Sequence, residues 1–227
     1  MFKGCFVTGT DTGIGKTLGS CVLLTALARH HAKVVGMKPI ASGLIPHEGG
    51  WASEDALALR AASTLKVPPE LDNPISLPDP LSPHLAAARA GRRIELPFLV
   101  ERYQTLAAQA DVVVVEGAGG WYVPLNEQHM MSDLAAALGL PVVLVVGLRL
   151  GCLNHAALSA EAIQARGLTL AGWVANRVDP DMACQEENLA WLKTHMTGRG
   201  VPLLADIPWQ AQPDPARATV TLPADWT

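Results

Sequence analysis

The residues best suited to chemistry lie near the start of the chain, in a loop between an apolar run and a segment of helical character. The stretch reads Phe6-Val7-Thr8-Gly9-Thr10-Asp11-Thr12-Gly13-Ile14-Gly15-Lys16-Thr17. In a strand–loop–helix unit, backbone N–H groups and the helix N-terminus hold phosphate oxygens. Lys16 is then placed to reach the β- and γ-phosphates, and the Thr17 hydroxyl to bind Mg²⁺. The pattern predicts a site for a nucleoside triphosphate with Mg²⁺.

The spacing of this loop differs from the common pattern, in which four residues separate the first glycine from Gly-Lys-Ser/Thr. Here five residues separate Gly9 from Gly15. A Gly-rich turn before an ordinary helix is therefore an alternative interpretation. The Lys-Thr pair and the strand-then-helix context favour phosphate binding.

Two apolar runs indicate the kind of sheet that positions the loop. Val112–Val115 and Val142–Val146 are apolar at every position rather than at every second one. Such runs are typical of strands buried on both faces of a parallel sheet. The predicted strands are Cys5–Thr8, Val34–Met37, Val112–Glu116, Val142–Val146, Leu170–Ala175 and Leu203–Ile207.

Helical segments alternate with these strands. They are Lys16–His30, Glu54–Ala62, Pro83–Ala90, Pro97–Ala110, Ser132–Leu138, Asn154–Arg166 and roughly Met182–His195. The alternation predicts one α/β domain over residues 1–227, doubly wound around a mostly parallel sheet. The Pro-rich connection from Pro68 to Pro83 is expected to be irregular, and a Pro-rich tail from about residue 210 is expected to wrap the surface.

Composition argues against several classes of function. Charged residues are 17% of the 227 residues and the formal net charge is -4, with no basic run, so nucleic acid is not an expected partner. The apolar runs have the length of strands, so no membrane association is expected. Cys5, Cys21, Cys152 and Cys184 are scattered, and no signal peptide precedes the first strand. Reduced thiols in a cytoplasmic protein are the expectation.

Polar residues follow three predicted strands at their carboxyl ends, where open parallel sheets bind ligands. These residues are Lys38, Glu116 and Asn176. A carboxylate such as Glu116 beside a phosphate loop suits Mg²⁺, although a strand-end charge bonded to the following glycine amides is the alternative. Asp55 is equally suited to metal binding and to the first turn of a helix capped by Ser53.

Lys38 is flanked by apolar residues and Pro39. A strand-end lysine is commonly a solvated charge. Together with Lys16, however, it would stabilise the charge that spreads over a transferring phosphoryl group. The Trp121-Tyr122 pair fits either a pocket wall or the core, and the amides before the helix at Asn154 fit an anion.

With these residues assembled, the chain resembles the dethiobiotin synthetase family of P-loop NTPases over nearly its whole length. The matching segments include Thr8-Gly9-Thr10-Asp11-Thr12 with Gly15-Lys16-Thr17, Lys38-Pro39-Ile40-Ala41-Ser42-Gly43, Ser53-Glu54-Asp55-Ala56, Ser82-Pro83-His84, Glu116-Gly117-Ala118-Gly119-Gly120-Trp121, Gly151-Cys152-Leu153-Asn154-His155, Gly172-Trp173-Val174-Ala175-Asn176 and Ile207-Pro208-Trp209. The five-residue loop spacing is itself part of the resemblance.

The resemblance implies an ATP-dependent ligase of biotin biosynthesis. One amine of 7,8-diaminopelargonic acid would add CO₂ to give a carbamate, and ATP would phosphorylate the carbamate to a mixed anhydride. The second amine would then attack, close the cyclic urea and release phosphate. Because that amine is tethered, its attack is favoured by proximity.

The resemblance also implies residue roles. Lys38, Lys16 and Thr12 would be catalytic, Thr17, Asp55 and Glu116 would bind Mg²⁺, and Ser42 with Thr12 would position the substrate. Asn176 would read adenine beside Pro208 and Trp209. The full set of implied nucleotide contacts is Gly13, Ile14, Gly15, Lys16, Thr17, Leu18, Asp55, Glu116, Gly117, Ala118, Gly119, Asn176, Arg177, Pro208 and Trp209.

A homodimer is implied as well, in which Cys152, Leu153 and Asn154 of one subunit hold the substrate carboxylate bound at the other. The chain departs from well-known members at three positions: Gly13 stands in place of Glu, Arg177 in place of an acidic residue, and Asn188 in place of Tyr.

Two other functions share parts of this pattern. A partitioning-type ATPase switch would carry an extra lysine early in the loop, where this chain has Thr10 and Asp11. An amidating ligase acting on a larger acid would usually bring a glutaminase domain, for which this chain is too short.

Overall fold

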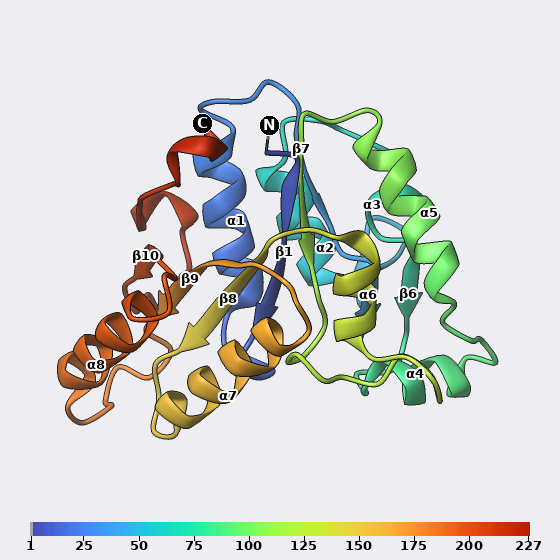
Figure 1. Cartoon of the computed structure of the whole chain (residues 1–227). Coiled ribbons are helices and arrows are strands. Elements are labelled where there is room, and N and C mark those ends of the chain that lie inside the picture. Colours follow the sequence, from blue (N-terminus) through green and yellow to red (C-terminus); the bar gives the residue numbers. More distant parts are fainter. Residues whose placement is uncertain (1) are drawn as a thin grey trace.

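A seven-stranded sheet forms the centre of the computed structural model, which describes residues 2–227 (Figure 1). The strand order is β11-β10-β9-β8-β1-β7-β2. Only the β10–β11 pairing is antiparallel, so the predicted doubly wound, mostly parallel sheet is confirmed. The strands are β1 (Gly4–Gly9), β2 (Val34–Met37), β7 (Val112–Glu116), β8 (Val142–Gly147), β9 (Leu170–Asn176), β10 (Leu203–Ile207) and β11 (Thr219–Val220).

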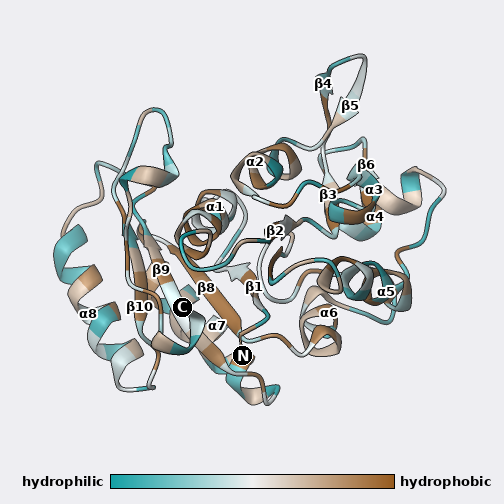
Figure 2. Cartoon of the chain, turned by 90° about the horizontal axis from the view of Figure 1, so that it is seen from above, coloured by the Kyte–Doolittle hydropathy of each residue, from teal (hydrophilic) through white to brown (hydrophobic). Residues whose placement is uncertain are grey.

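Helices cover both faces of this sheet (Figure 2). On one face lie α1 (Lys16–Leu27) and α2 (Glu54–Ala62); on the other lie α5 (Leu96–Ala107), α6 (Met131–Leu138), α7 (Cys152–Ala165) and α8 (Gln185–Thr197). The strands between them are apolar on both sides because each side packs against helices: Val112–Val115 are at most 1% exposed. The predicted helices are confirmed, and their ends shift by up to three residues, as helix boundaries commonly do.

The connection from Pro68 to Pro83 is not irregular, so that prediction was wrong. It contains α3 (Pro69–Asp72) and β6 (Ile75–Leu77), and it leads into α4 (Pro83–Arg89). Strand β6 pairs in parallel with β3 (Ile40–Ser42). A residue outside this segment helps to hold its backbone, because the Lys38 N–H donates to the Asp72 carbonyl at 2.7 Å. This small sheet carries Ser42 to the rim of the site.

A short hairpin, β4 (Ile45–His47) with β5 (Gly50–Ala52), projects from the body of the molecule between Ser42 and α2 (Figure 2). Its three-residue strands give too little alternation to be predicted from sequence. Helix α2 begins directly after it. The Ser53 hydroxyl accepts from the Ala56 N–H at 3.3 Å, so the predicted N-cap is confirmed.

The Pro-rich tail contains short elements of its own and runs back along the sheet and α1. It forms the short helix η1 (Pro215–Arg217), adds β11 to the sheet and ends in η2 (Ala224–Trp226). Trp226 is 3% exposed and stacks on Phe2, with ring centroids 4.1 Å apart. The tail therefore joins the two ends of the chain.

The cysteines carry no disulfide within residues 2–227; Cys5, Cys21 and Cys152 are buried and Cys184 is exposed. Over the same residues, the helices are too short or too polar to cross a bilayer.

Candidate active site

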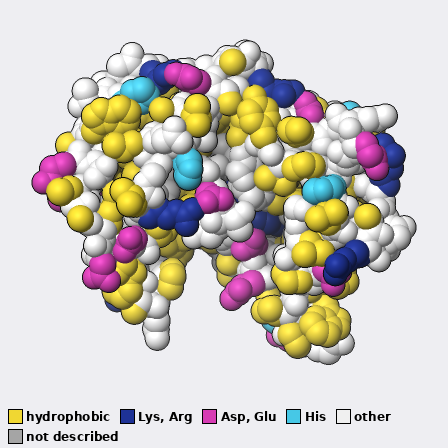
Figure 3. Space-filling model, turned by 90° about the horizontal axis from the view of Figure 1, so that it is seen from below, with side chains coloured by type: hydrophobic (Ala, Val, Ile, Leu, Met, Phe, Trp, Pro, Cys, Tyr) yellow, Lys and Arg dark blue, Asp and Glu magenta, His cyan; other side chains and the backbone are white. Residues whose placement is uncertain are grey.

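The carboxyl ends of the parallel strands meet at one rim, which Figure 3 views face on as a hollowed surface. A cavity of about 880 Å³ opens there. That volume lies within the range of small-molecule sites. The sequence-predicted residues that line it are Thr12, Gly13, Gly15, Lys16, Thr17, Lys38, Ser42, Asp55, Glu116, Ala118 and Gly119.

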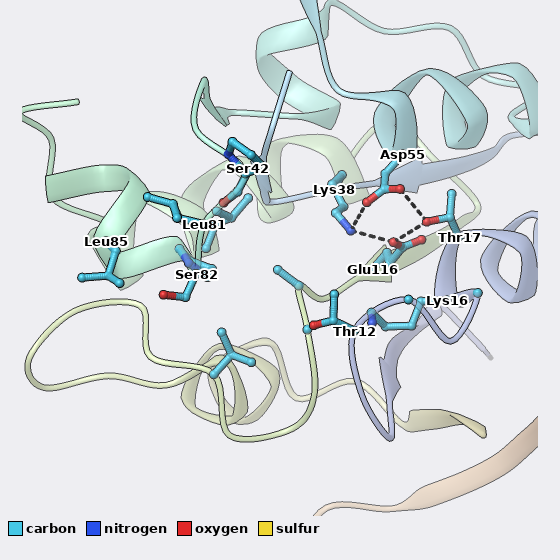
Figure 4. A pocket seen from close by; sticks show the side chains of 18 residues that line it. Thr12, Lys16, Thr17, Lys38, Ser42, Asp55, Leu81, Ser82, Leu85 and Glu116 are labelled. Atoms are coloured by element: carbon cyan, nitrogen blue, oxygen red, sulfur yellow. Dashed lines mark hydrogen bonds and ion pairs between the residues drawn. The ribbon is translucent and has the colours of Figure 1, made fainter. Parts of the chain in front are cut away.

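Lys38 lies at the centre of a charge cluster (Figure 4). Its Nζ is 2.6 Å from Glu116 Oε1 and 2.7 Å from Asp55 Oδ2. A third contact runs from Nζ to the Gly117 carbonyl at 3.3 Å. Lys38 is 4% exposed and Glu116 is fully buried. The alternative of a solvated strand-end lysine is therefore contradicted by the geometry.

The carboxylates keep this buried lysine charged. Burial by itself lowers the pKa of Lys38, but the charges of Glu116 and Asp55 outweigh burial and raise its pKa above the ordinary value. For Asp55 the effects have the opposite sign. Burial raises the pKa of this carboxyl, but the Lys38 ammonium and the Thr17 hydroxyl outweigh burial and bring the pKa below its usual range. The cluster holds one ammonium between two carboxylates.

Thr17 joins the same cluster. Its Oγ1 is 2.8 Å from Asp55 Oδ1 and 2.9 Å from Glu116 Oε1. A hydroxyl has a single proton to donate, so it cannot donate fully to both carboxylates. Glu116 Oε2 is buried and has no hydrogen-bond partner among the described residues. Two carboxylates and a hydroxyl with spare oxygen lone pairs are a donor set that suits a hard divalent cation.

The small number of carboxylates in the donor set also suits Mg²⁺. Within residues 2–227 no group of three or more His, Cys, Asp or Glu side chains could hold a metal alone. Mg²⁺ typically takes one or two carboxylates and completes its shell with substrate phosphates and water. The residues at Thr17, Asp55 and Glu116 fit that ion.

Lys16 faces the cavity from the opposite side (Figure 4). Its Nζ donates to the Asp11 carbonyl at 2.8 Å, and the side chain is largely buried. Burial, followed by the Lys38 charge, lowers the pKa of Lys16 to about 8. A bound phosphate would favour the ammonium form of Lys16 and raise this pKa.

An apolar wall closes the cavity on the far side, and no role was assigned to it from sequence. It is formed by Ile40, Pro80, Leu81, Pro83, Leu85 and Val123, with Ser82 among them. These residues come from β3, from the segment around α4 and from the loop after β7. The Ser82-Pro83-His84 motif is the sequence feature that points to this segment, but the motif does not indicate where the segment lies in the fold.

A second cavity of about 610 Å³ adjoins the first and shares Thr17 and Asp55 with it. Leu18 lies in this cavity rather than in the first. The walls come from the exposed sides of α1 and α2 and from tail residues Pro213, Asp214, Pro215 and Ala216. The two cavities therefore meet at the proposed metal ligands.

The residues expected at the base pocket lie at the same rim but outside both cavities. Asn176 is buried, and its Nδ2 donates to the Ile14 carbonyl at 2.9 Å, so it holds the phosphate loop. Arg177 is engaged with Asp206, Glu186 and Gln185. Trp209 follows Pro208 and is 51% exposed.

The predicted carboxylate-binding turn lies apart from both cavities. Cys152 and Leu153 open α7 and Asn154 follows in its first turn, after Gly151 with a φ of 94°. Cys152 is buried, and Asn154 is exposed. Of the aromatic pair considered as a pocket wall, Trp121 packs in the core and Tyr122 is exposed.

Comparison with known proteins gives close relatives. The family model described as "AAA domain" matches residues 3–217. The ATP-dependent dethiobiotin synthetase BioD of Aromatoleum aromaticum is 50% identical over 222 residues, covering 97% of this chain and 96% of that protein. The protein of the same name from Ralstonia nicotianae is 53% identical, covering 92% and 90%.

Solved structures extend the likeness in fold alone. A ParA family ATPase from Chlorobium tepidum matches with a TM-score of 0.53 at 15% identity, covering 93% of this chain and 86% of that one. A chain of the MinC:MinD cell division protein complex from Aquifex aeolicus matches with a TM-score of 0.54 at 12% identity, covering 92% of this chain and 82% of that one. The overall fold is thus shared with proteins whose sequences are far more distant.

Proposed function

The chain belongs to the family of ATP-dependent dethiobiotin synthetases, and we propose that the reactants of that enzyme meet where its two cavities adjoin. It is a ligase that closes the ureido ring in biotin biosynthesis with ATP. The proposal rests on one observation: the phosphate loop, two lysines and two carboxylates converge where the cavities meet.

The larger cavity takes the diamine and CO₂. Its apolar wall suits the aliphatic chain of 7,8-diaminopelargonic acid, and Thr12 and Ser42 supply hydroxyls beside it. The Ser42 hydroxyl is buried without a hydrogen-bond partner among the described residues, so it is free to bind a carbamate oxygen. The phosphates of ATP lie over Gly13–Leu18, where the two cavities meet, and the base extends along the same rim toward Asn176 and Trp209.

The residues then act on a carbamate and a γ-phosphate. One amine adds CO₂ and loses a proton, and a carbamate oxygen attacks the γ-phosphorus as ADP leaves. The second amine attacks the carbamoyl carbon of the mixed anhydride, loses a proton and expels phosphate. Lys16 and Lys38 donate to the oxygens that gain charge in the phosphoryl transfer.

Thr17, Asp55 and Glu116 would hold Mg²⁺ next to these lysines. When bound, the ion would neutralise charge on the β- and γ-phosphates. Lys38 contacts both carboxylates of that set and would share their negative charge with the ion. The nucleotide contacts of Gly117, Ala118, Gly119, Asn176, Arg177, Pro208 and Trp209 stay predictions from the family resemblance.

A homodimer completes the site in this proposal. The turn at Cys152–Asn154 lies outside both cavities of its own chain, which is the arrangement expected of a group that serves a partner. Backbone N–H groups at the start of a 14-residue helix are well suited to a carboxylate. Cytoplasmic location stays a prediction of the sequence.

The direct experiment supplies purified protein with Mg-ATP, bicarbonate and the diamine. Dethiobiotin and phosphate should form in equal amounts, and product should require all three reactants. ATP turnover that is indifferent to the diamine would contradict the proposal and favour a nucleotide switch of the ParA or MinD type.

A further inference from the structure

Asp11 makes two contacts within the phosphate loop and its helix and one with a distant segment, and the ligand roles proposed above use none of them. Its Oδ1 accepts from the Thr12 N–H at 2.7 Å, and its carbonyl accepts from Lys16 Nζ at 2.8 Å. Its Oδ2 forms an ion pair with Arg149 Nη2. One residue therefore orients both the loop's proposed substrate hydroxyl and its phosphate-binding ammonium.

Arg149 reaches the loop from another segment, whose backbone is held by hydrogen bonds. It lies between β8 and α7, and its carbonyl accepts from the Cys152 N–H at 3.0 Å. The preceding Leu148 N–H donates to the Asn176 carbonyl at 2.7 Å. The segment that carries the guanidinium is thus bonded to β9 on one side and to the first residue of α7 on the other.

The middle of the loop has few other supports. One end is held by the Thr10 N–H to the Val145 carbonyl at 3.0 Å, and the other by Asn176 on the Ile14 carbonyl at 2.9 Å. Within the part of the chain that the structure describes, the Arg149 ion pair is the hydrogen bond that ties residues 11–13 to a segment beyond the loop and α1.

Stability of the fold does not explain this ion pair. The Arg149 side chain is 41% exposed and that of Asp11 is 46% exposed. Exposed ion pairs of this kind contribute about 0–1 kcal/mol to folding. An arginine whose backbone is held in place can nevertheless stabilise one conformation of the glycine-rich phosphate loop.

We infer that Arg149 is a positioning residue that couples the phosphate loop to the start of α7 through Asp11. The inference rests on the proposed function, because it makes the loop that binds ATP and the turn proposed to bind the substrate carboxylate one mechanical unit. Binding at either place fixes Arg149 and Asp11, so the second ligand meets a loop that is already ordered. ATP in one subunit should then bind with positive coupling to the diamine in the partner's cavity, whose carboxylate that subunit's turn is proposed to hold.

The test measures ATP affinity by calorimetry with and without the diamine, in wild type, Arg149→Gln, Asp11→Asn and the double variant. Wild type should bind ATP about fivefold or more tightly with the diamine present. Each single variant should reduce that factor toward one, and the double variant should behave like either single variant, because both remove the same interaction. Arg149→Lys, which keeps the charge, should restore part of the coupling.

Two further results guard the interpretation. Arg199→Gln breaks an ion pair with Glu161 that joins the residues just after α8 to α7, and it should leave the coupling unchanged. If Arg149 instead contacts phosphate directly, Arg149→Gln will weaken ATP binding without the diamine and Asp11→Asn will not. That result, additive effects in the double variant, or equal ATP affinity with and without the diamine in wild type would overturn the inference. Dethiobiotin formation by the wild-type protein is measured separately. A failure of the proposed function can then be distinguished from a failure of the inference about Arg149.

Discussion

Lys38 illustrates how a buried charge is made available for chemistry. Desolvation opposes its ammonium form, and two carboxylates within 2.7 Å reverse that preference. The same carboxylates are the proposed metal ligands, so the lysine and the ion share their counter-charge. A side chain in this position serves both the resting fold and the reaction, and its two contributions can be separated experimentally.

Lys38→Met separates them, because Met keeps much of the side-chain volume and removes the charge. Product formation should fall by about 10²–10³, the usual cost of losing one preorganised donor in the transition state. Mg-ATP binding should change little, since the proposed metal ligands and the phosphate loop remain. The measurements are a dethiobiotin assay and Mg-ATP calorimetry.

Stability gives a second readout of the same variant. Breaking a buried ion pair costs about 3–5 kcal/mol, and the half-exposed Asp55 places the expected loss near the lower end. Added Mg²⁺ should recover part of the lost thermal stability, because it would neutralise the orphaned carboxylates. The exposed Lys66→Met serves as the control. Near-normal turnover in Lys38→Met would remove Lys38 from the mechanism.

Lys16 carries a prediction about pH. Burial and the neighbouring Lys38 lower its pKa to about 8, whereas bound phosphates would raise it. ATP therefore binds the protonated form more tightly. Affinity should be flat below about pH 7 and should weaken by up to about tenfold per unit as pH rises above the pKa of the free protein.

Calorimetry in buffers of different ionisation enthalpy measures the effect directly. Proton uptake on ATP binding should appear above about pH 8 and be absent near pH 6. The Lys16→Gln variant should bind weakly and without this proton uptake. A constant ATP affinity from neutral pH to well above pH 8 in the wild-type protein would contradict the assignment.

At the scale of elements, the phosphate loop depends on glycine in two different ways. Gly15 has a φ of 79°, and a Cβ there would lie 2.0 Å from Asn176 Nδ2. Gly13 has a φ of 73°, yet a Cβ there would meet nothing within 4 Å. The two positions share the backbone strain of a left-handed conformation and differ in the space around them.

This contrast makes a matched pair of variants. Gly13→Ala should weaken ATP binding only modestly, since left-handed strain costs about 1 kcal/mol. Gly15→Ala should weaken it more than tenfold further, because it must also displace the amide that holds the Ile14 carbonyl. Adding Asn176→Ala to Gly15→Ala should relieve the clash but not restore that hydrogen bond. Equal ATP dissociation constants for the two single variants would argue against the role given to Asn176.

Element prediction succeeded where one physical signal dominated. The valine runs of β7 and β8 are apolar throughout because both faces are covered, and Ser53 caps α2 by its side-chain chemistry alone. The strand β6 and the hairpin at Ile45–Ala52 escaped prediction because three-residue strands form from tertiary contacts, such as the one between Lys38 and Asp72, rather than from periodicity.

The site followed the same division. Lys38, Glu116 and the phosphate loop were predictable as neighbours because parallel strands end at one rim. The apolar wall around Leu81 and Leu85 was not, since it depends on how α4 folds back over that rim. Nor does any local pattern give the ion pair of Arg149 with Asp11, two residues far apart in sequence.

At the scale of the whole molecule, the two ends of the chain pack against each other away from the site. The tail packs along α1 and ends with Trp226 against Phe2, and its Pro213–Ala216 segment walls the second cavity. The turn at Cys152–Asn154 remains outside both cavities, and the role proposed for it in binding is played toward a second subunit.

Mixed dimers test that role. Asn154→Asp places a carboxylate in the first turn of α7, where the helix dipole favours it, so folding should be unaffected. The same charge should repel the substrate carboxylate and raise the KM for the diamine. Lys38→Met damages the other part of the site. If the turn serves the partner's cavity, a dimer of one subunit of each variant contains one site with both defects and one site with neither.

Two nearly inactive variants should then regain activity on mixing. With random exchange of subunits, about a quarter of all sites become intact, and turnover at low diamine should approach about a quarter of the wild-type value. The double variant Lys38→Met/Asn154→Asp mixed with wild type supplies the control, because each of its mixed dimers has two sites with one defect apiece. If the turn acted within its own subunit, mixing the single variants would restore nothing, while the control mixture would keep half of its sites intact.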